Sequence, residues 1–244
     1  MSFDLKGMNI LITGASSGIG RQAALTYGKH QANIIALGRS QSALETLDDD
    51  LAKYNCNVSL VPFNLMQFDL IKDMEQKLSQ RIDHLDVLFL NAAAFGSLTP
   101  ITHITEAEWN ETFAVNLTSN VIFLKLFEPY LKKTNQSQVL ISTTEIINQK
   151  KPFWGLYSAS KAALEQIAFS YAAETQNTNI KVNLIDPGIV NTKLRLKAYP
   201  GEDKQKITQP SDLSDFFEDI LFNDKFTNGE LIRYADWLES SKHI

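Results

Sequence analysis

The stretch YSASK places Tyr157 four residues before Lys161. On a helix this spacing puts both side chains on one face, one turn apart. A free tyrosine has a pKa of about 10, and a nearby positive charge favours tyrosinate and lowers that value toward neutral pH. Such a pair can donate and accept a proton. With seven tyrosines in the chain, one such spacing also arises by chance, so other motifs must support the interpretation.

A glycine-rich stretch, TGASSGIGR, follows the first apolar run and opens a segment with helical spacing. Gly14 allows a tight turn, Gly18 lets backbone N–H groups approach a ligand, and Gly20 allows the helix to pack closely on a sheet. The alternative is a sharp turn that binds nothing, but the position between strand and helix favours binding of a dinucleotide pyrophosphate. The predicted cradle comprises Gly14, Ser16, Ser17, Gly18, Ile19 and Gly20.

The second apolar run ends in ALGRS. A protein that prefers NAD usually carries an acidic residue here, about 20 residues beyond the glycines, to bind the ribose 2′-hydroxyl. Gly38 takes that place and Arg39 follows it. An acid would repel a 2′-phosphate, whereas a guanidinium binds one with paired donors. The sequence thus predicts NADP(H) rather than NAD(H); the alternative is that Arg39 is only a solvated loop residue.

The elements that must position these residues are short, nearly continuous apolar runs separated by segments with helical spacing. Such runs are typical of strands buried on both faces of a parallel sheet. Their alternation with helices predicts an α/β fold, a Rossmann-type doubly wound parallel sheet of about seven strands with helices on both faces. The predicted strands are 8–13, 33–38, 58–63, 86–92, 138–143, 180–186 and 230–234. The predicted helices are 18–29, 42–54, 67–80, 105–132, 155–176 and 211–222.

Two local features complete this outline. Ser42 and Glu45 have the spacing of a capping box at the start of the second helix. The stretch 192–210 shows no clear period, and we expect it to be either a substrate loop or a solvated loop.

No linker interrupts the alternation of strands and helices, which predicts a single domain over 1–244.

Composition limits the classes of function. The 244 residues are 44% hydrophobic and 21% charged, as in ordinary soluble proteins. A net charge of −5 gives no reason to expect a nucleic acid or an anionic membrane as a partner, and no apolar run is long enough to span a bilayer. The single Cys56 and an N-terminus unlike a signal peptide predict a cytoplasmic protein. The histidines, which lack metal-ligand spacing, are His30, His84, His103 and His243.

The glycine cradle and the YSASK pair are two of six motifs that follow one another along the chain. In this order and spacing they resemble the short-chain dehydrogenase/reductase family, most of all a bacterial subgroup of NADP-linked reductases. The resemblance runs from the first strand to residue 192 and is weaker beyond it. The other four motifs are NAAAFG within 88–96, FAVNL at 113–117, ISTTEI at 141–146 and IDPGIVNT at 185–192.

The resemblance implies a set of catalytic residues. Tyr157 would be the general acid/base, and Lys161 would also hold the hydroxyls of the nicotinamide ribose. Asn116 matches a helix asparagine whose backbone carbonyl holds a water of the proton relay. Thr144 stands where the family carries a serine that binds the substrate carbonyl, and a threonine hydroxyl offers the same donor and acceptor.

The resemblance also implies contacts to the cofactor. Asn91 matches the residue that fixes the fourth strand beside it, and 187–192 matches the segment that holds the nicotinamide carboxamide. Asn64 replaces an aspartate that pairs with the adenine amino group, and its carbonyl can accept the same bond. Ala93 replaces a glycine and adds a methyl group near the cofactor. The remaining cofactor residues are Leu65, Ala92, Pro187, Gly188, Ile189 and Thr192.

Together these implications predict an NADP(H)-dependent oxidoreductase that transfers hydride between the nicotinamide and a small carbonyl or alcohol substrate. The alternative is an NADP(H)-binding sensor or scaffold protein of the same fold with little turnover, which the changes at Thr144 and Ala93 keep open. The resemblance further implies a homodimer or homotetramer with contacts through 105–132 and 155–176. The candidates for an apolar pocket wall, with core packing as the alternative for each, are Phe95, Ile146, Phe153 and Leu194.

Overall fold

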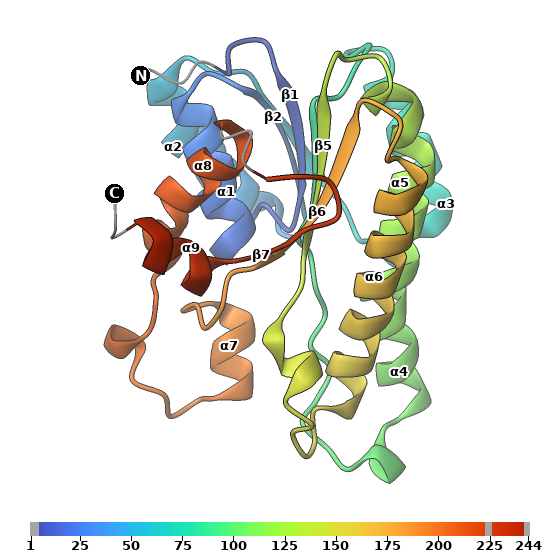
Figure 1. The fold of residues 1–244 in the computed structure, drawn as a ribbon, viewed down its shortest axis with the longest axis vertical. Coiled ribbons are helices and arrows are strands. Elements are labelled where there is room, and N and C mark those ends of the chain that lie inside the picture. Colours follow the sequence, from blue (N-terminus) through green and yellow to red (C-terminus); the bar gives the residue numbers. More distant parts are fainter. Residues whose placement is uncertain (1–4, 223–225, 242–244) are drawn as a thin grey trace.

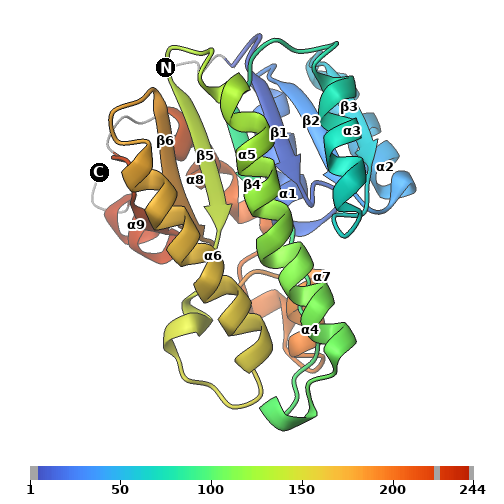
Figure 2. The same cartoon turned by 90° about the vertical axis from the view of Figure 1, so that its right-hand side faces the viewer.

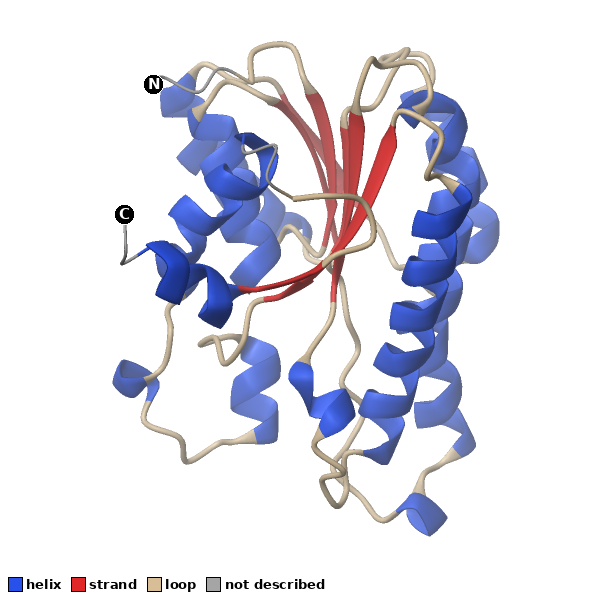
Figure 3. Ribbon diagram, in the orientation of Figure 1, coloured by secondary structure: helices blue, strands red, loops and turns tan. Residues whose placement is uncertain are grey.

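A computed structural model describes residues 5–222 and 226–241 of the chain. Its strands form one parallel sheet in the order β3-β2-β1-β4-β5-β6-β7, with helices on both sides (Figure 1 and Figure 3). The strand order reverses between β1 and β4, which confirms the predicted doubly wound fold. The strands are β1 (Asn9–Thr13), β2 (Asn33–Gly38), β3 (Val58–Pro62), β4 (Val87–Leu90), β5 (Ser137–Ser142), β6 (Ile180–Asp186) and β7 (Leu231–Arg233).

The helices cover the two faces of the sheet unequally. They are α1 (Gly18–Lys29), α2 (Gln41–Leu51), α3 (Phe68–Leu78), α4 (Glu106–Phe113), α5 (Ser119–Leu131), α6 (Gly155–Glu174), α7 (Lys193–Ala198), α8 (Ser214–Phe222) and α9 (Tyr234–Ser241). Helices α1, α2, α8 and α9 lie on one face, whereas α3, α5 and α6 lie on the other (Figure 1 and Figure 2). Helices α4 and α7 extend beyond the carboxyl ends of the strands (Figure 1). None of the described helices combines the length and apolar composition that crossing a bilayer requires.

Neighbouring residues of the central strand pack into different halves of the core. Ile10 and Ile12 of β1 belong to the apolar cluster that includes α1, α2 and α8, while Leu11 between them belongs to the cluster with α3, α5 and α6. All three side chains are fully buried. The strands therefore read as continuous apolar runs because helices cover both faces of the sheet.

The predicted helix 105–132 is two helices joined by a π-helical turn. Thr105 and Glu108 form a capping box at the start of α4, and the turn covers Ala114–Thr118 before α5 begins. A π-turn widens the helix and leaves backbone carbonyls without their usual partners. Within this turn the carbonyl of Asn116 accepts a hydrogen bond of 2.7 Å from Nδ2 of Asn120. Apolar spacing continues through the turn, so the sequence does not reveal it.

The capping box predicted at Ser42 and Glu45 is wrong. Helix α2 begins at Gln41, so Ser42 is already helical, and the hydroxyl of Ser40 instead accepts the N–H of Ala43 at 3.3 Å. Both serines are good N-cap residues, and the choice between them depends on where the chain leaves β2. The stretch 192–210 also differs from a plain loop, because it contains α7 and a short turn at Lys204–Lys206.

Candidate active site

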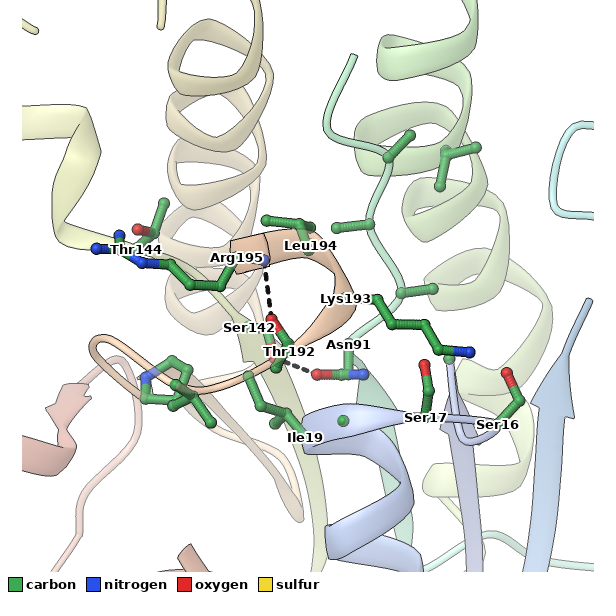
Figure 4. A pocket seen from close by; sticks show the side chains of 18 of the residues that line it. Ser16, Ser17, Ile19, Asn91, Ser142, Thr144, Thr192, Lys193, Leu194 and Arg195 are labelled. Carbon is green, nitrogen blue, oxygen red and sulfur yellow. Dashed lines mark hydrogen bonds between the residues drawn. The ribbon is translucent and has the colours of Figure 1, made fainter. Parts of the chain in front are cut away.

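The carboxyl ends of the central strands border a cavity of about 520 Å³. Ligands of open parallel sheets bind at this edge, next to the point where the strand order reverses, and the volume is typical of small-molecule clefts. Figure 4 shows the loop before α1 on one side of the cavity and the α7 segment on the other. All predicted site residues except Gly20 and Asn116 line it, namely Gly14, Ser16, Ser17, Gly18, Ile19, Arg39, Asn64, Leu65, Asn91, Ala92, Ala93, Thr144, Tyr157, Lys161, Pro187, Gly188, Ile189 and Thr192.

Backbone geometry explains the glycines of the first turn. Gly14 and Gly18 have φ angles of +71° and +56°, in the left-handed region that side chains disfavour. A Cβ atom on Gly20 would lie 2.6 Å from the carbonyl oxygen of Gly14 and equally close to Nδ2 of Asn91. The turn therefore has to be small, and it brings its backbone to the cavity at the N-terminus of α1, where phosphate groups bind well.

Asn91 fixes the ends of three neighbouring strands under the cavity. Its Nδ2 donates to the carbonyl of Thr13 at 3.2 Å, and its Oδ1 accepts from the hydroxyl of Ser142 at 3.1 Å. The hydroxyl of Thr13 in turn accepts the N–H groups of Asn91 and Ala92 at 2.9 and 3.0 Å. These bonds hold β1, β4 and β5 in a fixed relation and so form a rigid floor for the cavity.

The end of β2 has no room for an acidic side chain. A Cβ atom on Gly38 would lie 2.7 Å from Cβ of Ser16 and 2.8 Å from its hydroxyl oxygen. Arg39 follows at the cavity wall with an exposed side chain. After the neighbouring strand β3, Oδ1 of Asn64 accepts the N–H of Met66 at 3.1 Å, which leaves this oxygen one further lone pair for a ligand.

Tyr157 and Lys161 lie in the first two turns of α6 and are almost completely buried. Only 9% of Tyr157 and 2% of Lys161 is exposed. The ring of Tyr157 packs against Phe95 and Trp154 at centroid distances of 5.4 and 6.2 Å. Nζ of Lys161 donates to the carbonyl of Ser142 at 2.8 Å, so the end of β5 anchors the buried ammonium group.

Burial controls the ionisation of both side chains. It raises the pKa of Tyr157 far above the usual value, and the negative charge of Asp186 raises it further. Burial lowers the pKa of Lys161 to about 8. Burial and Asp186 thus act against the ionisation of Tyr157, and the expected favourable effect of the Lys161 charge stays a prediction.

Three consecutive hydroxyl groups, at Ser142, Thr143 and Thr144, border the cavity at the end of β5. The hydroxyl of Ser142 is used by Asn91. The hydroxyl of Thr144 accepts the N–H of Ile146 at 3.4 Å and caps a short turn, Glu145–Asn148, but its proton remains available to a ligand. The hydroxyl of Thr143 is buried without a partner in the described structure. Both threonines are thus candidates to bind a substrate oxygen.

Asn116 lies behind the cavity rather than in it. Its side chain is fully buried, accepts the N–H of Ala94 at 2.7 Å, and donates to the carbonyl of Ala94 and the hydroxyl of Ser160 at 2.9 Å. It therefore fastens the segment after β4 to helix α6, which carries Tyr157. The water site at its backbone carbonyl stays a prediction, and Asn120 already donates to that carbonyl.

The segment after β6 folds over the glycine turn. Oδ1 of Asp186 accepts the N–H of Gly188 at 2.9 Å, and Gly188 has a φ of +71°. The hydroxyl of Thr192 accepts the N–H of Arg195 at 3.1 Å and starts α7. A Cβ atom on Gly18 would lie 3.1 Å from Cγ2 of Thr192, so this segment lies directly against the glycine turn at the cavity.

Of the four residues predicted for the apolar wall, Leu194 lines the cavity. Phe95 and Ile146 do not line it and belong to the adjoining apolar cluster with Tyr157. Phe153 is wrong, because its positive φ of 71° turns the chain and leaves the side chain 55% exposed. Trp154 takes its place, buried and 5.2 Å from Phe95 between ring centroids. The signal for Trp154 was its position three residues before Tyr157, at the N-cap of α6.

This set of residues fits a nicotinamide dinucleotide. Glycines at the N-terminus of α1 leave room for a diphosphate, Gly38 and Arg39 suit a 2′-phosphate, and a buried lysine with an adjacent tyrosine marks the far end of the cleft. Among residues 5–222 and 226–241, no three His, Cys, Asp or Glu side chains are placed to bind a metal. His243 lies outside these ranges.

Comparison with known proteins gives a family. The model of the family described as short chain dehydrogenase matches residues 8–203. An uncharacterized oxidoreductase of Escherichia coli (strain K12), YciK, is 31% identical over 221 residues, which cover 88% of this chain and 86% of the relative.

Solved structures agree with that match. A short chain dehydrogenase from Salmonella enterica serovar Typhi superposes with a TM-score of 0.87 at 28% identity, covering 94% of this chain and 96% of that one. A short chain dehydrogenase from Escherichia coli CFT073, complexed with NADPH, superposes with a TM-score of 0.88 at 27% identity over 96% of this chain and 98% of that one.

Proposed function

The chain belongs to the short-chain dehydrogenase family of oxidoreductases, and on that premise we propose that it transfers hydride between NADP(H) and a carbonyl or alcohol substrate. The observation that carries the proposal is the buried pair of Tyr157 and Lys161 in one cavity with the glycine turn of Gly14 and Gly18. When bound, the nicotinamide supplies or accepts the hydride. A tyrosine that can exchange a proton has a clear use beside such a group.

The residues of this chain then have separate roles in proton transfer and in binding the cofactor and the substrate. Tyr157 donates a proton to the substrate oxygen during reduction and removes one during oxidation. Lys161 holds the ribose hydroxyls, and its charge favours the tyrosinate form. Thr144 orients the substrate oxygen through its hydroxyl. Asn116 maintains the position of α6 relative to the segment after β4 and offers its backbone carbonyl to a relay water.

NADP(H) is proposed over NAD(H) because of the geometry at the end of β2. Gly38 faces Ser16 too closely for an acid, and Arg39 presents an exposed guanidinium to the cavity. The relative from Escherichia coli CFT073 that is complexed with NADPH supports the same choice. Oxidoreductases that bind the 2′-phosphate usually do so with arginine at this place.

The substrate is proposed to carry apolar or aromatic bulk next to its carbonyl or hydroxyl group. Tyr157 lies in a buried cluster with the apolar side chains of Phe95 and Trp154, and Leu194 and Tyr199 of the α7 region pack against that cluster. The members of this cluster that line the cavity beside Tyr157, Trp154 and Leu194, give little stabilisation to a highly charged substrate. Ketones and aldehydes with a ring or an alkyl chain are therefore the first compounds to test.

A cofactor-binding sensor with little turnover is the second candidate. The raised pKa of Tyr157 and the use of the Thr144 hydroxyl as a cap favour it, since both make the site less ready for proton transfer. Turnover separates the two proposals. An enzyme oxidises NADPH on some member of a broad carbonyl panel and loses this activity in Tyr157→Phe, whereas a sensor binds NADPH equally well in both forms and turns over nothing.

The primary experiment is titration with NADPH and NADH, followed by quenching of intrinsic fluorescence to which Trp154 at the cavity wall contributes. Wild-type protein should bind NADPH more tightly than NADH. Arg39→Ala should remove that difference by weakening NADPH alone. Equal binding of the two nucleotides by the wild type would contradict the NADP(H) assignment, and no binding of either would contradict the oxidoreductase function.

We also propose a homodimer or homotetramer with contacts through α4, α5 and α6. These helices carry exposed apolar side chains, Trp109, Val121 and Ile167, each between 38% and 45% exposed. Light scattering coupled to gel filtration should give a mass of two or four chains. A charge placed at Val121 should shift that mass toward the monomer if the proposal holds.

A further inference from the structure

A lysine of the α7 segment lies over the glycine turn. Thr192 touches the space above Gly18, where an added Cβ would meet its Cγ2 at 3.1 Å. Lys193 is the next residue and lines the same cavity. Figure 4 shows its side chain extending across the cleft toward the side that carries Ser16 and Ser17. The ammonium group thus belongs to the region of the glycine turn, although the residue comes from the opposite wall.

The other cationic side chains that line the cavity interact with other groups or lie away from the glycine turn. Lys161 donates to the carbonyl of Ser142 deep in the cleft. Arg195 points its guanidinium at the carboxylate of Glu202, with Nε 2.7 Å from one carboxylate oxygen. Arg39 stands beyond Gly38, at the end of β2. Among the described lining residues, Lys193 is therefore the cationic side chain that can contact a ligand in the middle of the cleft.

The glycine turn itself offers only neutral donors to a ligand. Ser17 is the N-cap residue of α1, and its hydroxyl makes no cap hydrogen bond. Arg21, the cation of the motif, forms an ion pair with Asp50 of α2 and does not line the cavity. A diphosphate bound at this helix N-terminus would carry two negative charges with no side-chain cation of the turn to face them.

We infer that Lys193 binds the diphosphate of the dinucleotide from above and so holds the α7 segment closed over it. This inference rests on the proposed function, because it assumes that a dinucleotide occupies the cleft. The diphosphate is favoured over the 2′-phosphate because Lys193 directly follows Thr192, which covers Gly18, whereas the end of β2 already has the exposed cation Arg39. Lys193 is a residue for cofactor binding and loop closure, not for proton transfer.

The test is binding of NADPH and NADH to Lys193→Met, with Lys193→Arg and Lys204→Met as controls. Lys204 lies in the same stretch, 192–210, but is exposed and does not line the cavity. Its substitution by methionine therefore removes the same charge without affecting the cleft. We expect Lys193→Met to weaken both nucleotides by about fivefold, as for a solvent-exposed charge contact, and to reduce the salt dependence of binding. Lys193→Arg should restore most of the affinity, and Lys204→Met should bind like the wild type.

Two fragments make the assignment specific. ADP carries a diphosphate without a 2′-phosphate, and 2′-AMP carries the reverse. Lys193→Met should weaken ADP and leave 2′-AMP unchanged, while Arg39→Ala should do the opposite. Unchanged binding of NADPH, NADH and ADP in Lys193→Met would overturn the inference, as would a loss confined to NADPH and 2′-AMP. Tight NADPH binding by the wild type alongside either result would leave the proposed function standing, whereas wild-type protein that binds no nucleotide would overturn both.

Discussion

Nζ of Lys161 donates to the backbone carbonyl of Ser142 at 2.8 Å, so the buried ammonium group of α6 is anchored to the end of β5. The same strand end leads directly into Thr143 and Thr144. A single contact therefore sets the position of the lysine relative to hydroxyl groups that border the cavity. It also explains how a side chain that is only 2% exposed can keep a polar partner.

Lys161→Met should change the pH dependence of stability. The pKa of Lys161 falls from 10.5 to about 8 on folding, so between these values the unfolded chain binds more protons than the folded one. The free energy of unfolding of the wild type therefore gains a rising contribution across this window, which the methionine variant lacks. Urea unfolding of both proteins at a pH of about 7 and about 9.5 measures this. An identical change in the two proteins would show that Lys161 does not titrate in this range.

Asp186→Asn should lower the pKa of Tyr157. The carboxylate raises that pKa through its negative charge, and asparagine removes the charge while its Oδ1 can still accept the N–H of Gly188. In alcohol oxidation kcat/KM rises with pH as Tyr157 becomes able to accept a proton. The rising limb should move to lower pH in the variant, with little change in NADPH binding. A limb that stays in place would mean that Asp186 does not act on Tyr157.

The sheet and the order of its elements were predictable because the five inner strands are buried on both faces. Continuous apolar runs such as Ile10 to Ile12 have no other common explanation when helical segments alternate with them. The π-turn at Ala114–Thr118 was not predictable, since it adds a residue to a turn without changing the apolar pattern. The same holds for the cap of α2, where Ser40 and Ser42 are chemically equal candidates.

The residues of the site were predictable where a motif fixes the backbone, as at Gly14 and Gly188 with their positive φ angles. Prediction failed where three-dimensional packing decides. Phe153 and Trp154 are neighbours of similar chemistry, and a single left-handed residue turns one outward and the other into the cavity wall. The pKa of Tyr157 likewise depends on burial and on Asp186, which spacing to Lys161 alone does not reveal.

Substitutions at Thr143 and Thr144 should identify the hydroxyl that binds the substrate oxygen. Thr144→Val should reduce kcat/KM by about 10²-fold, the usual size of a lost donor to a reacting oxygen, and Thr144→Ser should keep most activity. Thr143→Val tests the other candidate, because its buried hydroxyl has no partner in the described structure and valine keeps the shape. Loss of activity in Thr143→Val with an active Thr144→Val would transfer the role to Thr143.

Gly20→Ala should destabilise the protein by about 1–3 kcal/mol, the usual cost of overpacking. The new methyl group would lie 2.6 Å from the carbonyl oxygen of Gly14 and from Nδ2 of Asn91. Neither can move cheaply, because the first is backbone in a left-handed turn and the second belongs to the Asn91 amide, which donates to Thr13 through Nδ2 and accepts from Ser142 through Oδ1. Gly201→Ala is the matched control, since an added Cβ there meets nothing within 4 Å. It should leave stability unchanged or raise it slightly by restricting the unfolded chain. Urea unfolding of the two variants and the wild type compares these free energies directly. Equal free energies of unfolding for Gly20→Ala and the wild type would mean that the turn can widen without a loss of stability. The close contact between α1 and Asn91 would then not be needed to hold the cavity floor together.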